Sequence, residues 1–134
     1  MLASRQEQID AIFGSETVEQ MISALEVGTE EWQGKALAAT KTRSPLSLKL
    51  TLEAIRQARN MQNLEDALNL EYRLTTRLFN CGEFVEGVRA LLVDKDKAPK
   101  WNPATLGGVG DELIAEFLGP LPDGEELNLK APQR

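Results

Sequence analysis

The sequence predicts an all-α protein of about six or seven helices. Apolar residues recur at spacings of three and four, and helix-capping residues stand ahead of most of these runs. Aromatic residues make up only 5% of the 134 residues. Leu, Ala, Val and Ile must therefore fill the core, and that composition suits helix packing better than a sandwich of strands.

Three helices are expected in the N-terminal third of the chain. Gly14 ends the first. Thr17 stands three residues before Gln20, which is the spacing of a capping box at the start of the second. Gly28 follows that helix as the expected C′ residue, and Thr29 is the expected cap of the third.

Longer helices are expected in the middle of the chain. In Ser44-Pro45, the serine supplies a capping oxygen and the proline suits the first helical position. The alternating leucines of residues 46–52 could also form a strand, but the cap and the polar run that follows favour a helix. Asn63 begins the next helix, and Gly82 separates it from another.

The character of the chain changes after residue 93. A mixed charge run over residues 94–97 leads into a proline-framed, extended segment over residues 98–103. Asp111 is the expected cap of a last short helix. The sequence thus predicts one helical domain over residues 1–118 and a loosely ordered tail over residues 119–134.

Composition narrows the range of functions. The net charge of −6 and the pI near 4.8 argue against broad binding of nucleic acid or anionic membranes. No stretch approaches the roughly 20 apolar residues of a membrane span. The chain has no histidine, so the commonest metal ligand and general base is missing, and we expect no metal site. The single cysteine, Cys81, fits a reducing compartment.

Residues that could carry chemistry mostly favour structural roles. Adjacent carboxylates such as Glu30 and Glu31 lie near helix starts, where they favour the dipole, and they diverge by about 100°. Without a histidine to deprotonate it, Cys81 is better explained as a boundary thiol. Gly87 lies inside a helical run, where glycine costs about 1 kcal/mol, so we expect close packing there against another backbone.

The segment from Lys95 to Trp101 is the most informative. It places Lys95, Lys97 and Lys100 within six residues of an indole ring on an otherwise acidic chain. One interpretation is a solvated turn anchored by Trp101. The other is a small anion site, in which ammonium groups meet phosphates and the aromatic face meets a purine. Composition alone does not separate these.

The run from Cys81 to Leu106, CGEFVEGVRALLVDKDKAPKWNPATL, resembles the C-terminal signature of the 3-hydroxyisobutyryl-CoA hydrolases of the enoyl-CoA hydratase/isomerase (crotonase) superfamily. The stretches at residues 44–52 and 70–74 fit the same family in the same order. The similarity extends over about residues 9–118. Family members usually carry acidic residues where this chain has Gly107-Gly108, so the connection to the last helix departs from the family's pattern.

The resemblance implies a protein that acts on short-chain acyl-CoA thioesters, with CoA as part of the substrate and not as a cofactor. In the superfamily, the oxyanion hole and the catalytic acids lie in an N-terminal core of repeated strand–helix turns, which has no counterpart in this sequence. We therefore expect the C-terminal helical region of a crotonase-like protein, inactive alone, and we assign no catalytic residue. The resemblance also implies valine breakdown, in the cytoplasm or in a mitochondrial matrix.

By position in the family, five residues are candidates for CoA contact: Phe84, Lys95, Lys97, Lys100 and Trp101. The expected partners are the crotonase core or a neighbouring subunit, including another copy of the chain in a homo-oligomer. The alternative hypothesis is a helical interaction or oligomerisation module without CoA binding. A histidine-free hydrolase that uses a carboxylate is the least favoured alternative.

Overall fold

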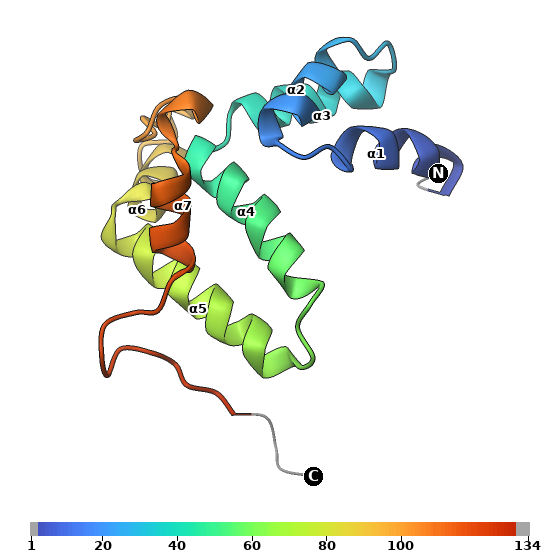
Figure 1. Cartoon of the computed structure of the whole chain (residues 1–134). Helices are drawn as coiled ribbons and strands as arrows, with labels where there is room; N and C mark the ends of the chain where they lie inside the picture. Colours follow the sequence, from blue (N-terminus) through green and yellow to red (C-terminus); the bar gives the residue numbers. More distant parts are fainter. Residues whose placement is uncertain (1–2, 131–134) are drawn as a thin grey trace. The chain divides into compact units, whose positions relative to one another are not determined.

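The computed structural model describes residues 3–130 and is helical over that range (Figure 1). Seven α-helices and three shorter helical segments are found in this part of the chain, and no strand. The prediction of an all-α fold with six or seven helices is confirmed. In chain order the elements are η1 (Ala3–Arg5), α1 (Gln6–Phe13), α2 (Val18–Glu26), α3 (Glu31–Lys41), α4 (Pro45–Ala58), α5 (Leu64–Asn80), α6 (Glu83–Val88), η2 (Arg89–Val93), η3 (Leu106–Gly108) and α7 (Asp111–Leu118).

These elements fall into two compact units, Met1–Arg43 and Ser44–Arg134. The first unit holds α1 to α3 and the second holds α4 to α7. The predicted division into a helical domain of residues 1–118 and a tail of residues 119–134 stays a prediction. Within residues 3–130, none of the helices combines the length and the apolar composition needed to cross a bilayer.

In the first unit, α2 contacts both α1 and α3. The predicted capping box is confirmed at its start. Gln20 N donates to Thr17 Oγ1 at 3.2 Å, and Thr17 N donates to Gln20 Oε1 at 3.2 Å. The two residues thus satisfy each other's backbone N–H groups, which would otherwise lack partners at the helix end. The buried apolar residues described in this unit are Ile12, Val18 and Leu25.

The start of α3 differs from the prediction. Glu30, not Thr29, is the N-cap residue, and Glu30 N donates to Gln33 Oε1 at 2.9 Å. Gly28 does follow the C-cap residue Val27 of α2, as expected. A residue without a side chain is needed at this position because a methyl group there would overlap the side chain of Gln33. Gly28 therefore leaves room for a glutamine that folds back over it and is buried.

The second unit is built around α4, which packs against both α5 and α7 (Figure 1). Its predicted start is confirmed, since Ser47 N donates to Ser44 Oγ at 3.1 Å and Pro45 takes the first helical position. The strand alternative for residues 46–52 is wrong. One apolar cluster fills the space between the three helices; its buried members are Leu46, Leu50, Ala54, Leu70, Leu74, Val109, Ile114 and Phe117.

The other predicted helix ends agree with the structure except at α7. Asp66 N donates to Asn63 Oδ1 at 2.9 Å, so Asn63 caps α5. Gly82 separates α5 from α6 with a φ of 90°, a left-handed conformation that glycine adopts at little cost. The N-cap of α7 is Gly110, and Asp111 is instead the first helical residue. A carboxylate there still favours the helix dipole.

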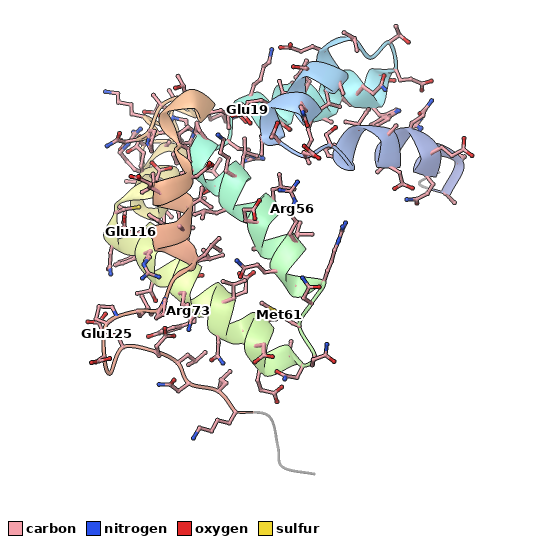
Figure 2. The ribbon with its side chains drawn as sticks, in the orientation of Figure 1. Glu19, Arg56, Met61, Arg73, Glu116 and Glu125 are labelled. Atoms are coloured by element: carbon pink, nitrogen blue, oxygen red, sulfur yellow. The ribbon has the colours of Figure 1, made fainter. Side chains whose placement is uncertain are left out.

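Residues 119–130 form no helix, but three side chains of α5 hold them. Asn69, Arg73 and Arg77 follow one another at four-residue spacing and so share one face of the helix. Arg77 Nη1 donates to Gly119 O at 2.7 Å, Arg73 Nε donates to Glu126 Oε1 at 2.8 Å, and Asn69 Nδ2 donates to Leu129 O at 3.0 Å. Figure 2 labels Arg73 on α5 and Glu125 in the tail segment next to it.

Glu126 also joins two parts of the tail to each other. Leu121 N donates to the Glu126 carboxylate at 2.7 Å, and the Leu121 side chain is buried. The hydrogen bond from Arg73 lowers the pKa of Glu126 below its ordinary value of 4.5. The resulting stabilisation is fully present above pH 4.5 and is lost as the pH falls through the lowered pKa. The tail predicted to be loosely ordered is thus tied to α5 as far as Leu129, and residues 131–134 lie outside the described part.

Candidate functional site

The candidate residues from the sequence lie on α6 and on the loop that follows η2, which we call the lysine loop (residues 94–102). Phe84 is on α6, and Lys95, Lys97, Lys100 and Trp101 follow one another along the loop. All three lysines are exposed, and within the described residues none of their ammonium groups has an ion pair or hydrogen bond. These ammonium groups are therefore available to an anion.

The far end of this loop is anchored by a buried carboxylate. Glu83, the first residue of α6, is 6% exposed. Its Oε1 accepts a hydrogen bond from Asn102 N at 2.8 Å, and its Oε2 accepts one from Ser44 Oγ. Because Ser44 also caps α4, Glu83 connects the start of α4, the start of α6 and the far end of the loop.

Arg89 holds the middle of the loop. Its guanidinium donates to both oxygens of Glu86, at 2.7 and 2.8 Å. Arg89 Nη1 also donates to Asp94 Oδ2 and to Asp96 Oδ2, each at 2.7 Å. Glu86 Oε1 in turn accepts a hydrogen bond from Lys100 N at 2.7 Å. One arginine and three carboxylates thus form a compact cluster, which we call the Arg89 cluster (Glu86, Arg89, Asp94 and Asp96).

Two carboxylates of the Arg89 cluster have lowered pKa values. The hydrogen bonds from Arg89, and then from Lys100 N, lower the pKa of Glu86 from 4.5 to about 2. The hydrogen bond from Ala98 N, and then that from Arg89, lower the pKa of Asp96. The carboxylates of the cluster, Glu86 first, raise the pKa of Arg89. Glu86 and Asp96 therefore stay charged at neutral pH and paired with the guanidinium.

Trp101 lies against α6 at Gly87. A β-carbon at Gly87 would stand 3.2 Å from Cη2 of the indole, which is a tight approach. The prediction that Gly87 permits close packing is confirmed, but the neighbour is an indole ring and not another backbone. The ring is half-buried, so one part of it packs on the helix and another part reaches solvent. Phe84, in contrast, stacks at a tilt on Phe79, with ring centroids 6.2 Å apart.

A concave site lies between the end of α4 and α5, away from this loop, with a volume of about 450 Å³. Amide side chains dominate its lining, namely those of Gln57, Asn60, Gln62 and Asn69. None of the candidate residues from the sequence lines it. Met61 and Arg73, both labelled in Figure 2, also border it, but the Arg73 guanidinium is already bound to Glu126. No free cation that could attract an anionic ligand is therefore evident among its described lining residues.

The sequence analysis missed the residues that shape the loop. It assigned Glu86 no partner, and it overlooked Arg89 and the buried carboxylate of Glu83. A signal was present, because Glu86 and Arg89 stand three residues apart on a helix and two aspartates alternate with lysines just after it. The pairing of Glu83 with Ser44 spans 39 residues and left no local signal.

Comparison with known proteins places these features in a family. The family model described as Enoyl-CoA hydratase/isomerase matches residues 1–118. The chain is 38% identical to the mitochondrial 3-hydroxyisobutyryl-CoA hydrolase of Gallus gallus, over 90% of this chain and 31% of that protein. It is 42% identical to the small ribosomal subunit protein mS47 of Arabidopsis thaliana, over 96% of this chain and 34% of that protein.

A solved structure has a similar fold over almost the whole of this chain. The crystal structure of an enoyl-CoA hydratase from Rhodobacter sphaeroides matches with a TM-score of 0.88 at 34% identity, over 96% of this chain and 37% of that one. The chain therefore spans about a third of the length of the relatives it matches.

Proposed function

Because the chain belongs to the enoyl-CoA hydratase/isomerase family, we propose that it is the C-terminal helical part of a 3-hydroxyisobutyryl-CoA hydrolase-like protein, and that it contacts CoA. The observation that carries this proposal is that Lys95, Lys97 and Lys100, all exposed, lie in the same short loop as the half-buried Trp101. Ammonium groups bind phosphates, and an aromatic face stacks on a purine, so the loop suits the nucleotide end of CoA.

A packing role is the second part of the proposal. Five large apolar side chains on α6 and η2 are more than half exposed; we call them the α6–η2 surface, and they are Phe84, Val85, Leu91, Leu92 and Val93. Large apolar groups left exposed together usually mark an interaction site. We propose that this surface packs on a crotonase core or on a neighbouring subunit, and that Phe84 reaches the CoA from there.

The reaction is assigned to another segment of the protein. In the resemblance described above, the oxyanion hole and the catalytic acids belong to an N-terminal core. We therefore expect no turnover by these 134 residues alone. The proposed substrates of the complete protein are short-chain acyl-CoA thioesters, in valine breakdown. Relatives named as mitochondrial 3-hydroxyisobutyryl-CoA hydrolases support this assignment, and they favour a mitochondrial matrix or, in a bacterium, the cytoplasm. Hydrolysis of 3-hydroxyisobutyryl-CoA by the purified chain would contradict it.

Calorimetric titration of CoA into the purified chain tests the proposed contact. We expect weak binding that Lys97→Ala and Trp101→Ala each reduce about tenfold, the effect of losing one charge-assisted hydrogen bond or one stacked base. Lys35→Ala is the matched control, since Lys35 is exposed and pairs only with Glu31 on α3. Equal losses in all three variants, or none, would contradict the proposal.

The second candidate is a helical interaction module without CoA binding. The relative from Arabidopsis thaliana that is named small ribosomal subunit protein mS47 favours it, because that name assigns the relative to the small ribosomal subunit. The α6–η2 surface would then be the contact surface. No heat at millimolar CoA, together with a stable oligomer in solution, would favour this candidate.

A further inference from the structure

Aspartates and lysines alternate over residues 94–97, and the left-handed backbone conformation occurs at the two lysines. Lys95 and Lys97 have φ angles of 55° and 54°, in the left-handed region that residues with a β-carbon rarely adopt. Asp94 and Asp96, between and beside them, are both bound by Arg89 Nη1 at 2.7 Å. The disfavoured conformation thus occurs at two of the three lysines that are proposed to meet phosphate.

We propose that Arg89 is a positioning residue for the nucleotide site: by binding Asp94 and Asp96 together, it fixes the backbone that presents Lys95 and Lys97. This role presupposes the CoA contact proposed above. Unusual backbone conformations persist only where surrounding contacts impose them, and here those contacts converge on one guanidinium.

Backbone hydrogen bonds complete the restraint. Asp94 N donates to Arg89 O at 2.8 Å, and Lys97 N donates to Ala90 O at 3.0 Å. Ala98 N donates to Asp96 Oδ1 at 2.9 Å, so the carboxylate of Asp96 joins the loop to Arg89. The loop therefore folds back on η2 and is held there by hydrogen bonds within the chain.

Arg89 also keeps the lysines unpaired. Residues 86–100 contain four cations (Arg89, Lys95, Lys97 and Lys100) and three anions (Glu86, Asp94 and Asp96), a net charge of +1. Each aspartate is adjacent in sequence to a lysine and could pair with it. Because the guanidinium takes all three carboxylates, the ammonium groups stay available to phosphate.

The double variant Asp94→Asn/Asp96→Asn separates positioning from simple charge. It makes the loop more positive by two charges, so a purely electrostatic role predicts tighter binding of CoA. Positioning by Arg89 predicts the opposite, a roughly fivefold to tenfold weaker affinity in calorimetric titration of the 134-residue chain. Glu112→Gln/Glu116→Gln is the matched control, because it removes two exposed carboxylates from α7 without changing the loop.

The salt dependence of binding distinguishes positioning from a general loss of structure. If Lys95 and Lys97 no longer meet the phosphates, the affinity of the double variant falls less steeply with added salt than that of the unaltered chain. Partial unfolding would lower the affinity and leave that slope unchanged. We expect the flatter slope, together with an unfolding midpoint close to that of the unaltered chain.

A failure of the proposed role of Arg89 can be told apart from a failure of the proposed CoA contact. CoA binding that Lys97→Ala weakens but that Asp94→Asn/Asp96→Asn leaves equal or tighter would overturn the role of Arg89 alone. A weaker affinity with an unchanged salt slope would overturn it as well. If the unaltered chain binds no CoA, the proposed function fails and the role of Arg89 fails with it.

Discussion

Replacing Leu50 by alanine is expected to lower the free energy of unfolding by about 2–5 kcal/mol, the cost of a cavity in a well-packed core. Leu50 is 2% exposed and belongs to the apolar cluster between α4, α5 and α7. Its removal leaves a void that residues from three helices would have to close. The measurement is the denaturant midpoint of the purified chain.

Ile55→Ala on the same helix is the control for this prediction. Ile55 is 54% exposed, so the loss should stay within about 0.5–1 kcal/mol. Similar costs for the two variants would mean that the outer face of α4 is covered in solution, for example by a second copy. A cost below about 1 kcal/mol for Leu50→Ala would mean that the described core is not the one that holds the second unit together.

Replacing Glu83 by alanine is expected to cost about 2–4 kcal/mol of stability. The Glu83 carboxylate is buried and accepts hydrogen bonds from Ser44 Oγ and Asn102 N. Without it both donors lose their acceptor, and an unsatisfied buried polar group costs about 1–3 kcal/mol. Thermal or denaturant unfolding of the variant measures this cost.

Glu83→Gln is the informative companion, because it keeps one oxygen acceptor and the side-chain volume. About half of the loss should be recovered. Since Asn102 follows Trp101, the alanine variant should also loosen the end of the loop and weaken CoA binding. Full stability in Glu83→Ala would show that the buried carboxylate does not join α4 to the loop.

Local capping signals made much of the fold predictable. The Thr17–Gln20 capping box, Ser44-Pro45 and Asn63 each satisfy backbone groups within three residues, so a short stretch of sequence determines them. The cap of α3 was predicted one residue too early, because the position of Gln33 and not the hydroxyl of Thr29 decides where that helix begins.

Contacts between distant residues were not predictable in the same way. The hydrogen bonds from α5 to the tail join residues 42 to 60 positions apart, and no local pattern marks them. The left-handed backbone at Lys95 and Lys97 runs against the preference of lysine, and it follows from the contacts of Arg89. The candidate residues could thus be named from sequence, whereas their supports required the structure.

The α6–η2 surface is the apolar region most directly connected to the proposed nucleotide site. Its five side chains are more than half exposed, and they lie on the elements that lead into the lysine loop. The buried leucines of α4, in contrast, are covered by α5 and α7. Coverage of the α6–η2 surface by a core or subunit would therefore also enclose the proposed nucleotide site.

The most direct test is a chemical-shift map of the ¹⁵N-labelled chain on addition of CoA. We predict that the perturbed amides and the indole N–H lie in residues 84–101, with Lys97 and Trp101 among them. Perturbations centred on the cavity between α4 and α5, or an unchanged spectrum at millimolar CoA, would contradict the assignment of the lysine loop as the CoA contact.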